Sequence, residues 1–150
     1  YRVGGSLYKS LPWSTTAEVG FRYLNFGGGG TTIYTASLTK YRGSYMYRVG
    51  TYVTPSESGT SVSVNGLVRR YFGDAQTYLG VSGSIGSSPA GQEAFEEDFQ
   101  RTRSWGVSVQ GQRPLNDRTR ISGSLGYDFE EFTRRTQRRV SATVSVSYDF

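Results

Sequence analysis

Apolar and polar residues alternate along most of this chain, and the pattern is clearest at its end. Residues 140–150, which read VSATVSVSYDF, alternate without a break. Because successive side chains of a strand point to opposite faces, this run predicts a strand with one apolar and one polar face. A soluble chain seldom finishes this way, since a frayed end leaves backbone groups and apolar surface unpaired. In a closed barrel the last strand is paired on both edges, so the run favours the closing strand of a membrane β-barrel.

The same alternation recurs in nine segments of about ten to thirteen residues, close to the roughly nine to eleven that a tilted strand needs to cross a bilayer. In the segment 118–129, Leu125 and Phe129 share one face of the predicted strand, and Ser124 lies on the other. Lys40 interrupts an apolar face, and we expect its side chain to extend to the membrane edge. The predicted strands are 1–9, 14–26, 31–41, 44–54, 60–72, 76–86, 103–112, 118–129 and 139–150.

The predicted fold class is all-β, an antiparallel up-and-down transmembrane β-barrel with about eight to ten strands in one domain, residues 1–150. Only 35% of the residues are hydrophobic, which suits strands that show lipid every second side chain and enclose a polar lumen. Bacterial single-chain barrels have an even strand count, so nine segments favour the C-terminal part of a larger barrel. An eight-stranded barrel with one misread segment is the alternative, and a soluble β-sandwich is the alternative outside a membrane.

The connections alternate in length, which predicts an orientation. Counting back from Phe150, the short connections are 114–117, 73–75, 42–43 and 11–12, and the others are 130–137, 87–100, 55–59 and 27–30. Barrels have short periplasmic turns and longer external loops. We therefore expect an integral protein in the outer membrane of a Gram-negative bacterium, with a periplasmic C-terminus.

Aromatic residues sort toward the two ends of the predicted strands, as expected for girdles at the two membrane surfaces. The external set is Phe21, Tyr23, Phe26, Tyr34, Trp105, Tyr127 and Phe129, and the periplasmic set is Trp13, Tyr41, Tyr45, Tyr71, Phe72, Tyr148 and Phe150.

Several phrases resemble a known family. They are SLP at 10–12, GFRYLNF at 20–26, IYTASLTKY at 33–41, YVTPS at 52–56, RRYFGD at 69–74, YLG at 78–80 and GSSP at 86–89. They are similar to the YaiO-type outer-membrane β-barrel family, most clearly between 10 and 89. The resemblance implies an outer-membrane barrel, often longer than this chain and in some members preceded by a periplasmic helical-repeat region. Its architecture is similar to that of polysaccharide-export porins, an analogy of fold alone.

The chain end also resembles the insertion signal of barrel proteins. Tyr148 and Phe150 match its two aromatic positions, while Val144 and Ser145 replace its polar residue and glycine. The resemblance implies the barrel-assembly machinery as a partner.

Arginine dominates the polar face of the predicted strands. A ring of arginines in a pore would concentrate anionic solutes. The alternative is that arginines and glutamates, Glu18 among them, pair across strands and hold a filled lumen rigid. The candidate lumen residues are Glu18, Arg22, Arg48, Tyr52, Asn65, Arg69, Tyr78, Gln110, Arg118, Arg120 and Arg139.

Two charged runs fall in predicted external segments. Arg134, Arg135 and Arg138 belong to a basic run that could bind lipopolysaccharide phosphates or remain solvated. The acidic run of Glu96, Glu97 and Asp98 could pair with the basic run or hold a divalent cation. We expect no metal, since adjacent carboxylates alone are a weak metal signal.

The residue types present restrict the function. Cys and His are absent, which removes the usual general bases and transition-metal ligands, so we expect neither an enzyme nor a cofactor. The 17 basic residues are spread over many strands, which argues against nucleic-acid binding. The leading hypothesis is a pore for a polysaccharide or another anionic solute. The second is a non-conducting structural or surface-recognition barrel that docks envelope proteins or phage, and a lipid-modifying enzyme ranks last. Outer-membrane lipid and lipopolysaccharide are expected partners in each case.

Overall fold

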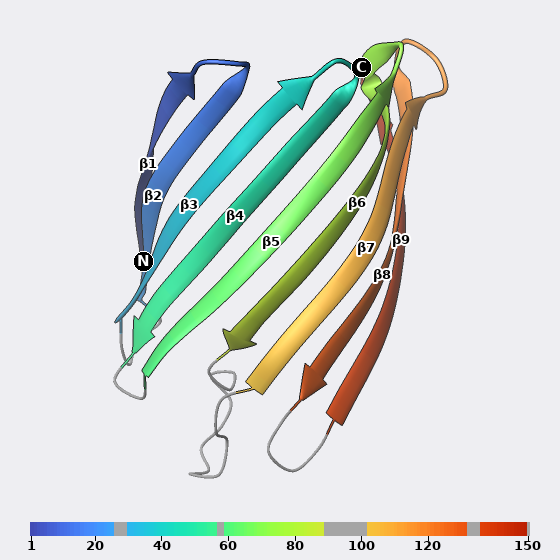
Figure 1. The fold of residues 1–150 in the computed structure, drawn as a ribbon. Helices are drawn as coiled ribbons and strands as arrows, with labels where there is room; N and C mark the ends of the chain where they lie inside the picture. Colours follow the sequence, from blue (N-terminus) through green and yellow to red (C-terminus); the bar gives the residue numbers. More distant parts are fainter. Residues whose placement is uncertain (26–29, 57–58, 89–101, 132–135, 150) are drawn as a thin grey trace.

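A computed structural model shows one sheet of nine strands and describes residues 1–25, 30–56, 59–88, 102–131 and 136–149 (Figure 1). The strands are β1 (Arg2–Leu11), β2 (Thr15–Asn25), β3 (Gly30–Arg42), β4 (Tyr45–Ser56), β5 (Gly59–Phe72), β6 (Asp74–Ser88), β7 (Thr102–Pro114), β8 (Thr119–Glu131) and β9 (Thr136–Tyr148). Every strand is antiparallel to the next in sequence. The all-β, up-and-down prediction and the count of nine are confirmed.

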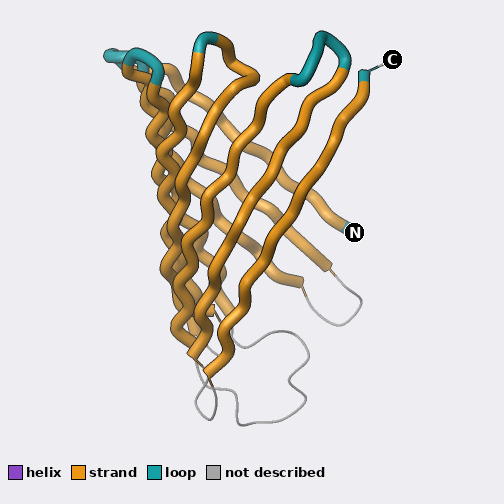
Figure 2. The backbone as a smooth tube through the Cα atoms, turned by 90° about the vertical axis from the view of Figure 1, so that its right-hand side faces the viewer, coloured by secondary structure: helices purple, strands orange, loops and turns teal. Residues whose placement is uncertain are grey.

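No helix in the described part of the chain is long and apolar enough to cross a membrane. The tube view shows only strands and turns there, with the strands tilted together across the sheet (Figure 2).

The strands begin and end within three residues of the predicted limits. The largest difference is at β9, which begins at Thr136. Arg138 and Arg139 therefore lie in a strand, and the assignment of Arg138 to an external loop was wrong. The reason is register, because Arg138 pairs with Phe129 and Arg139 with Asp128 at the end of β8.

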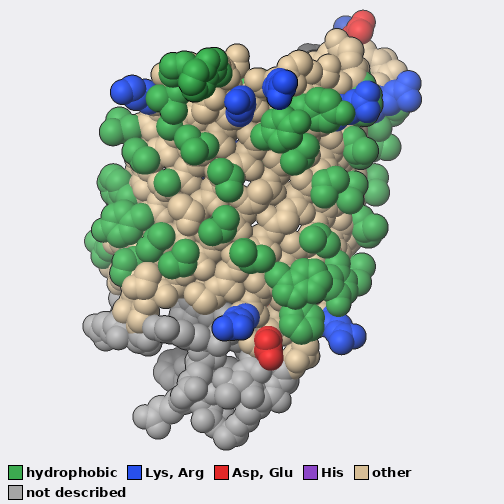
Figure 3. Space-filling view, viewed as in Figure 1, with side chains coloured by type: hydrophobic (Ala, Val, Ile, Leu, Met, Phe, Trp, Pro, Cys, Tyr) green, Lys and Arg blue, Asp and Glu red, His purple; other side chains and the backbone are tan. Residues whose placement is uncertain are grey.

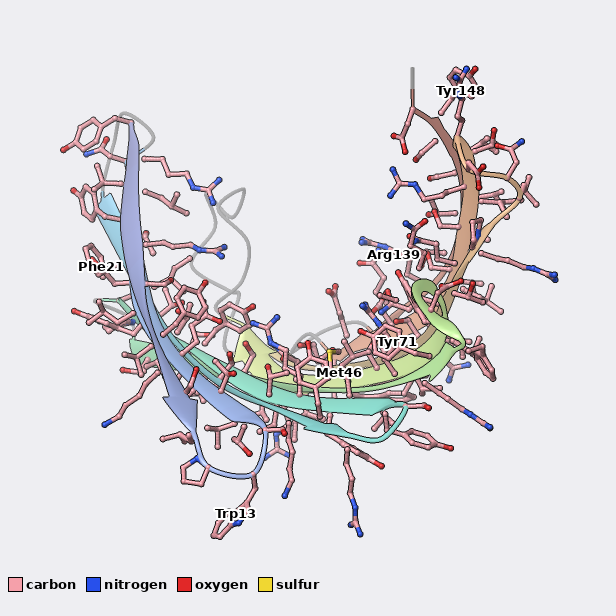
Figure 4. The ribbon with its side chains drawn as sticks, turned by 90° about the horizontal axis from the view of Figure 1, so that it is seen from above. Trp13, Phe21, Met46, Tyr71, Arg139 and Tyr148 are labelled. Atoms are coloured by element: carbon pink, nitrogen blue, oxygen red, sulfur yellow. The ribbon has the colours of Figure 1, made fainter. Side chains whose placement is uncertain are left out.

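The sheet curves strongly but does not close among the described residues. The strand order runs from β1 to β9, so each of these two strands has a neighbour on one edge only. Seen along the strands, the sheet is an open trough with β1 and β9 on opposite rims (Figure 4). The expectation that the last strand is paired on both edges is therefore not met within the nine strands.

The two faces of the sheet differ in polarity, as the alternation predicted. One register row on the convex face joins Val81, Val109, Leu125 and Ala142 across four strands. Val81 and Leu125 are 53% and 59% exposed, and apolar side chains cover this face in Figure 3. Met46 is the only apolar side chain buried among the described residues. Since the sheet has no conventional core, its apolar face needs an apolar solvent, which a bilayer supplies.

Four connections of one to four residues lie together at one end of the sheet, called the turn end (Figure 1). The β1–β2 turn uses positive φ at Trp13 and Ser14, 60° and 55°. Gly43 and Gly73 supply positive φ in two others, 56° and 85°, where glycine carries no Cβ penalty. The opposite end is called the loop end. It carries the connections 26–29, 57–58, 89–101 and 132–135, which lie outside the described residues.

The aromatic girdles are correct in part. At the loop end, Trp105 lies 5.6 Å from Tyr127 and 5.7 Å from Phe129, centroid to centroid. At the turn end, the assignment of Tyr41 and Tyr71 to the girdle was wrong, because the register places both side chains on the concave face. Both rings lie near a strand end, but depth along a strand does not determine which face a side chain shares. Phe26 and Phe150 lie outside the described residues.

Candidate functional site

The concave face gathers ten of the eleven polar candidates. The strand register places their side chains on the inner side of the trough. Figure 4 shows Arg139 and Tyr71 within the trough, while Phe21 and Trp13 point away from it. The ten are Glu18, Arg22, Arg48, Tyr52, Asn65, Arg69, Tyr78, Gln110, Arg120 and Arg139. The eleventh, Arg118, is exposed in the turn between β7 and β8.

This face carries more positive than negative charge. On the nine strands, the cations that share it are Arg2, Arg22, Arg48, Arg69, Arg120 and Arg139, and the anions are Glu18, Asp128 and Glu130. A trough lined by one excess sign of charge raises the local concentration of the opposite ion.

Glu18 organises a polar network across four strands. Its Oε1 accepts a hydrogen bond from the Tyr8 hydroxyl at 3.0 Å, and its Oε2 accepts one from Ser37 Oγ at 3.0 Å. Arg48 Nη2 donates to Glu18 Oε2 at 3.2 Å and to Ser37 Oγ at 3.4 Å. The carboxylate thus ties β1 and β4 to the strands between them. Charge-assisted bonds of this kind hold side chains in place more firmly than neutral ones.

Replacing Glu18 with glutamine should lower the free energy of unfolding by about 0.5–1 kcal/mol. The amide keeps the size of the side chain but removes the charge that pairs with Arg48, whose side chain is 45% exposed. Urea unfolding in lipid vesicles measures the change. Glu130→Gln is the matched control, since Glu130 shares the concave face but has no ion pair within 4 Å among the described residues. Equal losses in both variants would contradict the prediction.

A second cluster lies nearer the turn end, around Arg69. Its guanidinium carbon is 4.0 Å from the centre of the Tyr78 ring, a cation–π contact. Tyr78 meets Tyr71 edge-on at 6.1 Å, and the Tyr71 hydroxyl donates to Met46 Sδ at 3.8 Å. Arg69 Nε is buried without a hydrogen-bond partner, and no carboxylate of the described residues pairs with this arginine. Arg69 is therefore a fixed cation whose charge is not neutralised by a neighbouring acid.

The last two strands hold the other arginines differently. Arg120 Nη2 contacts both carboxylate oxygens of Asp149, at 3.0 and 2.8 Å. Arg139 pairs in register with Asp128, but the two form no ion pair within 4 Å. The Asp128 carboxylate instead lies over Gly106, where a Cβ would clash with Asp128 Oδ1.

Three hollows on the concave face share bordering residues and are together called the polar groove. The first, about 30 Å³, is bordered by Glu18, Arg22 and Asn65. Asn65 also borders the second, about 350 Å³, which serines line on β6, β7 and β8. Gln110 borders this second hollow and a third of about 180 Å³ beside Tyr78. The groove therefore runs from the Glu18 network toward the Arg69 cluster and offers hydroxyl and amide groups along its length.

The remaining candidates do not join this site. Glu96, Glu97, Asp98, Arg134, Arg135 and Phe150 lie outside the described residues. Arg138 lies on the convex face, opposite Phe129 in register, and Tyr148 ends β9. Among the residues that the structure describes, no group of three or more His, Cys, Asp or Glu side chains could hold a metal ion.

Some residues of the site were not predicted. The side chains of Tyr8, Ser37 and Met46 point to the concave face, and the alternation of their strands could have predicted this. Their contacts depend on which strand positions face one another, and one sequence does not supply that register.

Comparison with known proteins adds one match. A family model described as YaiO membrane beta barrel domain matches residues 1–91. The matched range includes β1 through β6, and with them the Glu18 network and the Arg69 cluster. No curated protein matches this chain at a significant level.

Proposed function

Since this chain belongs to the YaiO membrane beta-barrel family, and so is an outer-membrane β-barrel, we propose that its sheet forms part of the wall of a pore for anionic solutes. The observation that carries the proposal is the uncompensated arginine charge on the concave face, above all Arg69 beside Tyr78. An arginine that already had an acid partner would contribute little to the field in the lumen. Arg69 has no such partner among the described residues, so its charge acts on whatever enters.

An acidic polysaccharide is the solute class that this groove suits best. Hydroxyl and amide side chains along the hollows can exchange hydrogen bonds with sugar hydroxyls, and the arginines can bind carboxylate or phosphate groups. The exposed edges of β1 and β9 require partners inside a membrane, because unpaired backbone groups are costly in lipid. We infer that further strands beyond these nine complete the pore wall, and that the turn end faces the periplasm.

Planar-bilayer recordings test the pore. We expect conductance with a preference for anions, and the double variant Arg22→Ala, Arg69→Ala should reduce that preference about threefold or more, because two lumen charges are removed. Arg103→Ala is the matched control, since Arg103 lies on the convex face at the loop end and should leave selectivity unchanged. A conducting protein whose selectivity is the same in the double variant would contradict the role of these arginines.

A second candidate is a barrel that does not conduct and serves as a structural or surface-recognition element. The Glu18 network favours it, because Tyr8, Ser37 and Arg48 converge on one carboxylate and fill part of the trough. Absence of channels from correctly folded protein in planar bilayers would select this candidate over the pore.

A further inference from the structure

The convex face has a groove near the turn end that no function described above uses. Its volume is about 420 Å³, and most of the surface that lines it is apolar. Gly111 and Gly123, which pair directly between β7 and β8, leave its floor without side chains. Phe72, Ile121 and Val144 form its walls. A glycine pair on a lipid-facing sheet thus produces a shallow apolar groove between larger neighbours.

One end of this groove is basic. Arg113 lines it and lies one residue before the end of β7, at the turn end. The guanidinium carbon of Arg70 is 5.0 Å from the centre of the Phe72 ring, so a second cation adjoins the same wall. Both arginines are exposed. Neither has a carboxylate partner within 4 Å among the described residues.

The charges on the convex face are distributed unequally between its two ends. At the turn end, five basic residues share the convex face of the strands, namely Lys9, Lys40, Arg42, Arg70 and Arg113. The strand register places one acidic residue beside them, Asp74, which pairs with Phe72 and whose carboxylate accepts hydrogen bonds from the backbone N–H groups of Gln76 and Thr77. At the loop end, Arg103 pairs in register with Glu131, near Arg138. Lysine and arginine side chains form a row above the apolar band in Figure 3. The turn end therefore complements negative charge just where the apolar surface stops.

We propose that this groove is a binding site for a glycerophospholipid with an anionic headgroup. One acyl chain lies over Gly111 and Gly123, and the phosphodiester binds Arg113 and Arg70. An apolar groove with cations at one end matches a ligand that has a hydrocarbon chain on one side and an anion on the other. A free phosphate would leave the groove empty, and an acidic protein surface would leave its apolar floor without a partner. The proposal is independent of whether the barrel conducts.

Native mass spectrometry of the purified protein, exchanged into equal amounts of phosphatidylglycerol and phosphatidylcholine, tests the site. We expect wild-type protein to retain phosphatidylglycerol preferentially. The variant Arg70→Gln, Arg113→Gln should reduce that preference about tenfold, since each interfacial cation contributes to attraction of anionic lipid. Arg103→Gln with Arg138→Gln is the matched control, because it removes the same charge from the loop end and should leave the preference unchanged.

A second variant tests the groove without changing charge. A Cβ at Gly123 would meet its nearest neighbour, Thr143 O, at 3.6 Å, which is ordinary van der Waals contact. Gly123→Leu should therefore fold, fill the groove and lower retention of phosphatidylglycerol while Arg70 and Arg113 remain. Equal retention of both lipids by wild-type protein would overturn the proposal. So would an unchanged preference in both groove variants, or displacement of the lipid by inorganic phosphate or an acidic peptide as effectively as by phosphatidylglycerol. Heat-modifiable migration in gels confirms that each variant is folded.

Discussion

Replacing Val109 with arginine should lower the free energy of unfolding in a bilayer by about 2–4 kcal/mol, the cost of arginine on the lipid face near the midplane of a barrel. Val109 lies in the middle of β7, 45% exposed, in the convex row that joins Val81 to Leu125. In lipid, the guanidinium would lose its hydration without gaining a partner, because apolar side chains surround it on the neighbouring strands. Urea unfolding of the protein in phosphatidylcholine vesicles, followed by tryptophan fluorescence, measures the change.

The adjacent residue supplies the control. Gln110 is next along β7 but points to the concave face, where it borders two polar hollows. Gln110→Arg should change the free energy of unfolding by less than about 1 kcal/mol, because the new charge stays in a polar, hydrated trough. If both variants lost the same amount, the convex face would not be the lipid-facing one, and the assignment of the two faces would be wrong.

Alternation alone was enough to predict the strands and their two faces. Each segment carries its own signal, since Leu125 and Ser124 must point in opposite directions in any extended strand. The connections could be located too, because Gly43 and Gly73 mark turns that need positive φ. These are local properties, and a single sequence contains them.

Register was not available from the sequence, and the contacts between strands could not be predicted for that reason. Glu18 was expected to pair with an arginine across strands, but the sequence did not identify that arginine as Arg48, which lies two strands away, beyond Ser37. The error at Tyr71 has a different cause, because Tyr71 lies two residues from Arg69 on β5 and alternation alone puts both on the concave face. A contact such as that between Glu18 and Arg48 depends on the register of the strands that carry the two residues.

The groove over Gly111 and Gly123 depends on register in the same way. Each glycine alone could mark a bulge, a corner or a close approach. Only their direct pairing across β7 and β8 leaves two side chains missing at one place on the convex face. The open trough is likewise a property of nine strands together, because curvature accumulates from the twist between neighbours.

Inward glycines make room for the residues of neighbouring strands, and Gly86→Ala tests this where the nearest atoms are a Cβ and a Cα. Gly86 pairs directly with Ser63, and a Cβ at Gly86 would lie 2.7 Å from Ser63 Cβ and 3.1 Å from its Cα. Those atoms are held by the backbone of β5 and cannot rotate away, so the two strands must separate locally. We expect a loss of about 1–3 kcal/mol in the free energy of unfolding, as for overpacking of other tight interiors. The same urea titration in vesicles measures it.

Gly66→Ala is the matched control on the neighbouring strand. Gly66 faces outward, and a Cβ there would have nothing within 4 Å. The added methyl group would contact lipid, and alanine loses less backbone entropy than glycine on folding, so the free energy of unfolding should stay the same or rise slightly. A loss at Gly66 as large as that at Gly86 would mean that glycine is needed for backbone freedom in these strands. A loss confined to Gly86 would show that the concave face is packed closely enough between β5 and β6 to exclude a single methyl group.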